Sequence, residues 1–199
     1  HIITCVTEHK AILDSVKHLG KSGVRVTYLP VGTDGLIDLD ELKNAITDKT
    51  ILISVMTVNN EIGVIQDVKE IGRIAREHGV LFHTDAVQAA GKIPFDVQEM
   101  NVDIASLSAH KMYGPKGVGA IYVRRRNPRV LLSPMIDGGG HERGMRSGTL
   151  NVPGIVGFGK AAEIAQQELV EESARILRLR DRLRSKFEEN LDEVFINGD

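Results

Sequence analysis

The sequence predicts an α/β fold in which a mostly parallel sheet carries helices on both faces. The first observation is that apolar, strand-like runs alternate with runs of helical periodicity over most of the chain. A strand–helix–strand order requires crossover connections, and crossovers impose parallel pairing. The second observation is the apolar run ILISVMTV, residues 51–58, because parallel strands buried on both faces are apolar along their length.

The elements follow in chain order. A strand, IITCV, ends before Thr7, whose hydroxyl is expected to cap a helix that stops near Gly20. The remaining predicted elements are a strand over 24–29, a helix over 39–46, a strand over 50–58, a helix over 67–79, a strand over 80–87 and a strand that includes Val102, Ile104, Ala105 and Leu107. Gly114, Pro115, Gly117 and Gly119 predict turns after that strand.

From about residue 156 the pattern changes to one long amphipathic helical stretch, in one piece or broken, followed by a strand in EVFING, residues 193–198. We therefore expect residues 1–160 to form a large domain that lacks its N-terminal part. Residues 161–199 are expected to form a connecting helix and the start of a second, smaller domain. The chain begins without methionine and stops just after a short apolar run, which predicts a segment of a longer protein.

Composition excludes several classes of function. The 199 residues carry a formal net charge of −2, which provides no basic field for nucleic acid or anionic lipid. A single cysteine, Cys5, excludes an internal disulfide framework and fits a reducing compartment, and we expect its side chain to lie in the core. Neither a membrane span nor a signal peptide is predicted.

Polar side chains gather where the predicted strands end. In open α/β sheets, ligands bind beyond the carboxyl ends of the strands. Four successive strand runs end in such groups: Thr7, Glu8 and His9; Asn59, Asn60 and Glu61; His83, Thr84, Asp85 and Gln88; Ser106, Ser108, His110 and Lys111. Four such ends predict one shared site.

Other chemistries fit these residues less well. GPKGVG is not a phosphate-binding P-loop, because its lysine precedes the last glycines. His78, His83 and Asp85 do not have the spacing of a helical metal pair, and we expect no metal. No G-x-S-x-G elbow of a serine hydrolase is present.

A lysine at one strand end, a carboxylate at another and hydroxyls beside the lysine suit pyridoxal 5'-phosphate. The lysine forms a Schiff base, the carboxylate pairs with the pyridine nitrogen, and hydroxyls bind the phosphate. A carboxylate opposite the ring nitrogen keeps that nitrogen protonated, so the ring accepts electrons when a bond to the α-carbon of the substrate breaks.

Five motifs carry a more specific resemblance. TEHKAIL, VNNEIG, HTDAVQAAGKIP, SLSAHKMYGPKGVGAIYVRR and GGGHERGMRSGT occur in order, and the sequence resembles the cysteine desulfurases. These are pyridoxal-phosphate enzymes with the large domain of the type I aminotransferase fold. HERGMRSGT resembles the branch that supplies sulfur for iron–sulfur clusters.

The resemblance implies a role for each matching residue. Lys111 corresponds to the Schiff-base lysine, and Lys111 and His9 to the proton carriers. Asp85 corresponds to the partner of the ring nitrogen, Gln88 to the residue that bonds the ring phenolate, and His9 also to the histidine that stacks on the ring. The remaining matches are Asn60 with the ring oxygen and substrate carboxylate, Ser108 and His110 with the phosphate, and Thr149 with the phosphate of a neighbouring subunit.

The resemblance also implies a reaction and partners. L-cysteine is converted to L-alanine and a protein-bound persulfide, and the sulfur passes to an iron–sulfur scaffold or another acceptor protein. We expect a homodimer in the cytoplasm, with an organelle such as the mitochondrion as the alternative. The sulfur-accepting cysteine of the family falls beyond Asp199, so we expect this chain alone to be incomplete. Two alternatives stay open: another type I pyridoxal-phosphate enzyme, such as a selenocysteine lyase or an aminotransferase, and a folded, dimerising domain without turnover.

Overall fold

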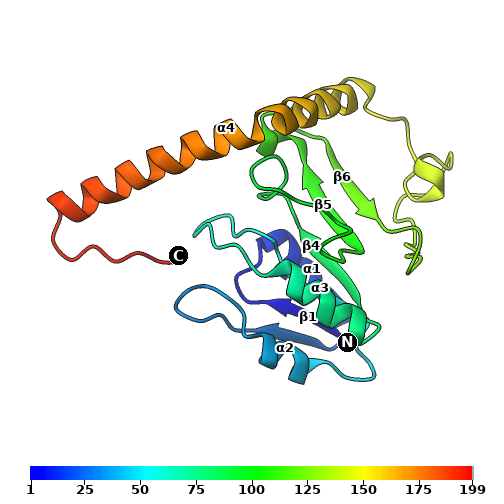
Figure 1. Cartoon of the computed structure of the whole chain (residues 1–199). Helices are drawn as coiled ribbons and strands as arrows, with labels where there is room; N and C mark the ends of the chain where they lie inside the picture. Colours follow the sequence, from blue (N-terminus) through cyan, green and yellow to red (C-terminus); the bar gives the residue numbers. More distant parts are fainter. Residues whose placement is uncertain (199) are drawn as a thin grey trace.

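The computed structural model describes residues 1–198, which fold around one six-stranded sheet (Figure 1). The strands lie in the order β2-β1-β3-β4-β5-β6, and only β6 runs antiparallel to its neighbour. The strands are β1 (Ile2–Cys5), β2 (Val26–Leu29), β3 (Leu52–Ser54), β4 (Leu81–Asp85), β5 (Ile104–Ser108) and β6 (Gly119–Val123). The prediction of a mostly parallel α/β sheet is confirmed.

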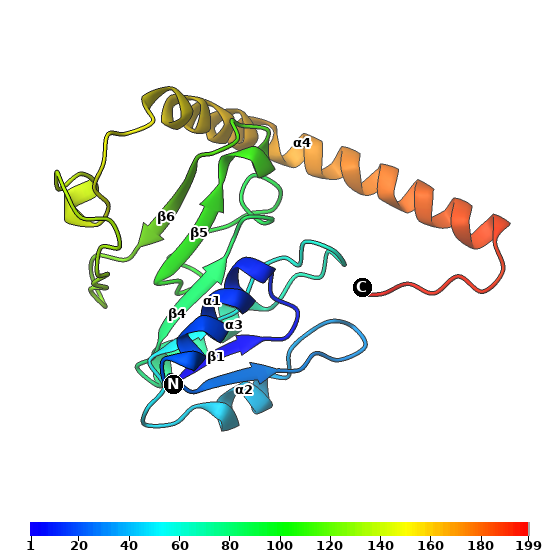
Figure 2. The same ribbon diagram turned by 180° about the vertical axis from the view of Figure 1, so that it is seen from behind.

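The helices cover both faces of this sheet. They are α1 (Lys10–Lys21), α2 (Leu39–Ala45), α3 (Val68–Glu77) and α4 (Val152–Asn190), with short 3₁₀ helices η1 (Ala109–Met112) and η2 (Glu142–Gly144). Figures 1 and 2, which view the molecule from opposite sides, show α3 in front of the sheet in one view and α1 in front in the other. The core between these layers is apolar, with Ile3, Ile53, Ile71 and Phe82 fully buried.

Helix α4 is continuous over 39 residues and passes over η1, while its C-terminal half extends away from the sheet in both views. Its close approach to the chain after η1 depends on Gly157, where a Cβ atom would come within 2.5 Å of Pro115 Cγ. The expected domain division between residues 160 and 161 falls inside this helix. That division stays a prediction. Asp199, the last residue of the expected second domain, lies outside the described residues.

A cluster of charges, in which Asp103 and Arg124 are buried and Arg76 is partly exposed, joins the end of β6 to the neighbouring strands. Asp103 Oδ1 lies 3.0 Å from Arg124 Nε and 3.1 Å from Arg76 Nη2, and Asp103 Oδ2 accepts the N–H of Phe82 at 3.0 Å. Removing one member of such a pair typically costs about 3–5 kcal/mol, because a buried charge is left without a partner. The cluster therefore fixes the start of β5 and the end of β6.

Three predictions of strands and turns are wrong. Strand β3 ends at Ser54 rather than Val58, because the N–H of Met56 donates to the side chain of Glu8 and the ladder to β1 stops at Thr4 and Ser54. The described residues 193–198 form no strand, since no neighbouring strand pairs with them and Phe195 is exposed. Gly119 opens β6 instead of lying in a turn.

Candidate functional site

The candidate site lies at the edge of the sheet where the parallel strands end. Strands β1, β3, β4 and β5 are neighbours, so their carboxyl ends meet at this edge. The predicted residues come from the segments that follow these strands: His9 after β1, Asn60 after β3, Asp85 and Gln88 at and after β4, and Ser108, His110 and Lys111 at and after β5.

Backbone and side-chain hydrogen bonds hold these segments together. The N–H of Thr57 donates to the carbonyl of Asp85 at 3.0 Å, and the N–H of Ala86 donates to the carbonyl of Ser106 at 3.0 Å. The side-chain amide of Asn59 donates to the carbonyl of Thr7 at 2.8 Å. The structure therefore brings the ends of β1, β3, β4 and β5 together as the sequence predicts.

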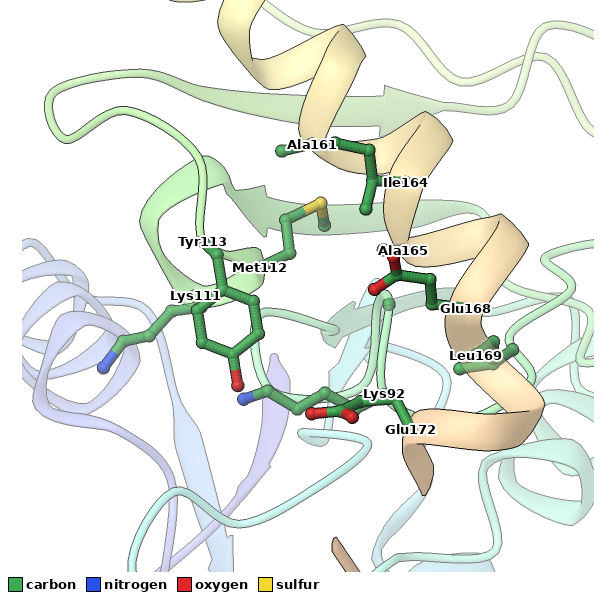
Figure 3. Close-up of a pocket in the computed structure, with 11 residues that line it drawn as sticks. Lys92, Lys111, Met112, Tyr113, Ala161, Ile164, Ala165, Glu168, Leu169 and Glu172 are labelled. Carbon is green, nitrogen blue, oxygen red and sulfur yellow. The ribbon is translucent and has the colours of Figure 1, made fainter. Parts of the chain in front are cut away.

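Lys111 lies in η1, directly after β5, and its side chain is exposed. Figure 3 shows the side chain pointing away from α4, while Met112, which is buried, lies close to that helix. The tight 3₁₀ turn ends at Tyr113, which has a left-handed backbone with φ of 64°. This turn separates the exposed amine from the packed side of η1.

Asp85 is the last residue of β4 and is buried, with 8% of its surface exposed. Its Oδ1 accepts the N–H of Val87 at 2.9 Å. This contact holds the carboxylate at the strand end and leaves Oδ2 for a cationic partner. The side chain is thus placed to stabilise a positive charge brought to this edge.

His9 caps helix α1, which is a correction to the expected Thr7 cap. Its Nδ1 accepts the N–H of Ala11 at 3.1 Å, so the neutral ring carries its proton on Nε2. Thr7 instead contacts the thiol of Cys5, with 3.1 Å between Oγ1 and Sγ. The cap fixes the orientation of an exposed imidazole at the N-terminus of α1.

The smaller polar residues differ in how they are held. Ser108 Oγ lies 2.9 Å from His110 Nδ1, so hydroxyl and imidazole form a pair at the end of β5. Gln88 is half-buried, and its Oε1 accepts a hydrogen bond from Lys92 Nζ. Asn60 is exposed on the turn after β3. Each lies at the end of a site strand or in the segment that follows one, and their contacts with a ligand stay a prediction.

Thr149 is the one predicted residue that the fold does not bring to this edge. It is exposed and belongs to the segment between η2 and α4, which leaves the sheet beyond the edge strand β6 (Figure 1). The expectation that a second copy of the chain receives Thr149 stays a prediction.

A small cavity lies between η1 and α4. It has a volume of about 120 Å³, and Lys92, Lys111, Tyr113, Glu168 and Glu172 line it together with apolar residues of η1 and α4 (Figure 3). Burial, followed by the positive charge of Lys111, lowers the pKa of Lys92. The cavity therefore contains a second amine close to the site, which the sequence did not single out.

Glu8 is buried where the loop after β1 meets the segment after β3. Its Oε1 accepts the N–H of Met56 at 2.5 Å, and only 5% of the residue is exposed. Burial is the main cause that raises the pKa of Glu8 to about 8; the Met56 N–H opposes it and the negative charge of Asp85 adds to it. Sequence reasoning placed Glu8 at a strand end but gave it no role.

His83 forms a polar link across three strands beneath the site. Its Nδ1 lies 2.8 Å from Ser54 Oγ on β3, and its Nε2 lies 3.0 Å from Ser106 Oγ on β5. Burial lowers the pKa of His83 to about 4, and the charge of Asp85 opposes this only in part. The imidazole is therefore neutral near pH 7 and supports the floor of the site.

This burial predicts a loss of stability in acid. The unfolded chain binds a proton to His83 below pH 6.5, whereas the folded chain binds it only near pH 4. The free energy of unfolding that neutral, buried His83 contributes is complete above pH 6.5 and is lost as the pH falls towards 4. Its size is roughly 3 kcal/mol. Urea unfolding at several pH values should show that the stability advantage of wild type over His83→Gln shrinks through this range.

A matched control is His18→Gln, which removes an exposed histidine from α1. This variant should keep the pH dependence of wild type, because His18 is exposed and takes no part in the link between β3, β4 and β5. If His83→Gln instead shows the same acid slope as wild type, His83 is not held neutral by the fold.

Two further observations on the described residues concern metal ions and membrane spans. Within residues 1–198, no group of three His, Cys, Asp or Glu side chains is placed to hold a metal ion. His78 ends α3, where its Nδ1 lies 2.9 Å from the carbonyl of Ile74. In the same residues no helix has both the length and the apolar character needed to span a membrane.

Comparison with known proteins shows which family the chain is similar to. The family model Aminotransferase class-V matches residues 1–198. A cysteine desulfurase IscS from Anaeromyxobacter sp. (strain Fw109-5) is 61% identical over 198 residues, which cover all of this chain but 49% of that protein. The chain thus spans about half the length of the curated relatives it matches.

Solved structures agree with this sequence relationship. A structure titled NifS-like protein superposes with a TM-score of 0.90 at 47% identity, covering 94% of this chain and 51% of that one. A structure titled SspA in complex with cysteine gives a TM-score of 0.78 at 48% identity, covering 82% of this chain and 47% of that one.

Proposed function

Because the chain belongs to the aminotransferase class-V family, we propose that the full-length protein is a pyridoxal-phosphate-dependent cysteine desulfurase. It converts L-cysteine to L-alanine, leaves the sulfur as a protein-bound persulfide, and supplies that sulfur for iron–sulfur clusters. The observation that carries the proposal is that an amine, a carboxylate and an imidazole come from neighbouring strand ends. The high identity to a cysteine desulfurase over the whole chain supports the choice of substrate.

The groups present fit the chemistry of pyridoxal 5'-phosphate. Its aldehyde requires a primary amine, which Lys111 supplies from an exposed position. Its ring nitrogen requires a carboxylate, which Asp85 supplies from the end of β4. Its phosphate requires hydrogen-bond donors, which the Ser108 and His110 pair supplies at the end of β5. When bound, the cofactor accepts electrons from the bond that breaks at the substrate α-carbon.

The residues of the site have separate roles in binding the cofactor and in moving the proton. Lys111 Nζ binds the cofactor and carries the proton at the substrate α-carbon, because it is the exposed amine beside the strand ends. Nδ1 of His9 is already occupied by the N–H of Ala11, so His9 presents an N–H and orients the ring. Asp85 holds the positive charge at the ring nitrogen, and Gln88 and Asn60 contact the ring oxygen.

Cys5 does not accept the sulfur in this proposal. Only 1% of the residue is exposed, and burial raises the pKa of its thiol, so little nucleophilic thiolate forms. The acceptor cysteine is instead part of the full-length protein beyond the residues described. The thiolate attacks the substrate sulfur, the carbon–sulfur bond breaks, and a proton replaces sulfur on the carbon that becomes the methyl group of alanine.

A homodimer completes the site in this proposal. Thr149 is exposed and lies beyond β6, so as a phosphate ligand it has to come from a second copy. A cytoplasmic location also remains part of the proposal.

Product analysis tests the function. The full-length protein, loaded with cofactor and incubated with L-cysteine and a thiol reductant, should release alanine and sulfide in equal amounts. An aminotransferase would instead form a keto acid and require an amino-group acceptor. A non-catalytic domain would bind cofactor and form neither product, and either of these results would overturn the proposal.

A further inference from the structure

Glu8 is a buried carboxyl group with one of its two oxygens unpaired. Oε1 accepts the N–H of Met56, but within residues 1–198 Oε2 is buried and has no hydrogen-bond partner. A carboxylate shares its charge between both oxygens, and a buried charged oxygen without a donor is costly. The geometry therefore favours the neutral acid, in which Oε1 is the carbonyl oxygen and Oε2 carries the proton.

A neighbouring charge acts in the same direction. Asp85, at the end of β4, is negative when ionised and raises the pKa of Glu8. Cys5, at the end of β1, is buried and its own pKa is raised, so little thiolate forms there. Two neighbouring carboxyl groups with few donors hold one negative charge more readily than two. The raised pKa of Glu8 is consistent with the proton lying on Glu8.

The contact of Glu8 with Met56 also shapes the site. The segment between β1 and α1, residues 6–9, is here called the His9 loop. It is attached to the segment after β3 at two points, through Glu8 Oε1 to Met56 N and through the carbonyl of Thr7 to Asn59 Nδ2. Glu8 directly precedes His9. The hydrogen bond from the N–H of Met56 to Glu8 therefore fixes the position of the His9 backbone, from which the imidazole extends.

We propose that Glu8 is a positioning residue that, as an uncharged acid, holds the His9 loop against the end of β3 and leaves the negative charge on Asp85. The part of this inference that concerns His9 and the cofactor rests on the proposed function. The protonation state of Glu8 does not, because it follows from burial and hydrogen bonding in the chain itself.

Infrared spectroscopy of the cofactor-free, full-length protein tests the protonation state. Wild type should show the C=O stretch of a protonated carboxylic acid near pH 7 that disappears with a midpoint near pH 8. Glu8→Gln should lack this band, whereas Glu99→Gln, which changes an exposed glutamate, should keep it. Absence of the band from wild type, or its persistence in Glu8→Gln, would overturn the inference.

Binding of pyridoxal 5'-phosphate tests the positioning role. Glu8→Gln keeps a neutral acceptor for Met56 and should bind the cofactor within about threefold of wild type, whereas Glu8→Leu should bind it roughly tenfold more weakly. A Gln variant as weak as the Leu variant would show that a charge is required, which contradicts the proposal. If Glu8→Leu does not fold, the affinity of Glu8→Gln decides alone.

The two measurements separate the two proposals. If wild type binds no cofactor but shows the carboxylic-acid band, the proposed function fails and the neutral state of Glu8 stands. If wild type binds cofactor and the band is absent, the inference about Glu8 fails and the function stands.

Discussion

Replacing Lys111 with alanine should lower the desulfurase activity of the full-length protein by roughly 10³-fold to 10⁴-fold. The amine has two tasks, a covalent bond to the cofactor and proton transfer at the substrate α-carbon, and alanine performs neither. Production of alanine from L-cysteine measures the loss. Far-ultraviolet circular dichroism should be unchanged, because the Lys111 side chain is exposed and points away from α4.

The control for this variant is Lys116→Ala, which removes another exposed lysine from the turn after η1 and should keep most of the activity. Borohydride reduction of the loaded protein, followed by peptide mapping, should leave the mass of the cofactor on the peptide that contains Lys111. Lys92 is the competing amine, since its lowered pKa leaves a larger fraction of its side chain unprotonated. Modification of Lys92 instead would show that Lys92, and not Lys111, forms the Schiff base, which contradicts the proposed role of Lys111.

The position of this site could be predicted from the sequence because the argument depends on topology alone. Once strands and helices alternate, the sheet is parallel, and residues after successive strands meet at one edge. Asp85 and Ser108 lie at the ends of neighbouring strands β4 and β5, as this reasoning requires. Lys111 follows β5 by a few residues and therefore lies beyond the same edge of the sheet.

Two of the details that the sequence did not predict depend on contacts between residues far apart in the chain, and one is a local helix cap that sequence preferences do not favour. Periodicity extends the third strand to Val58, but Glu8, 48 residues from Met56, takes the N–H that would continue the ladder. Histidine is not among the usual helix caps, so His9 could not be chosen over Thr7 from sequence preferences. The low pKa of His83 arises from burial by neighbouring strands, which no local pattern contains.

Substituting Asp85 with asparagine should reduce activity by roughly 10²-fold to 10³-fold while the fold is kept. Asparagine retains an oxygen that accepts the N–H of Val87, so the local turn persists. It removes the negative charge that holds a proton on the ring nitrogen, and without that proton the cofactor is a weaker acceptor of electrons. Rates of alanine formation, with the visible absorption of the bound cofactor, report the two effects separately.

The matched control is Asp96→Asn, because Asp96 Oδ1 accepts the N–H of Gln98 at 2.7 Å in the same two-residue arrangement as Asp85 and Val87. Asp96 is exposed and does not lie at a strand end, so this variant should keep the activity of wild type. Equal losses in the two variants would mean that the effect is not specific to the carboxylate of Asp85, which contradicts the prediction. A loss confined to Asp85→Asn means that it acts through its charge, and since Glu8 beside it is expected to be neutral, that charge has no substitute at this edge.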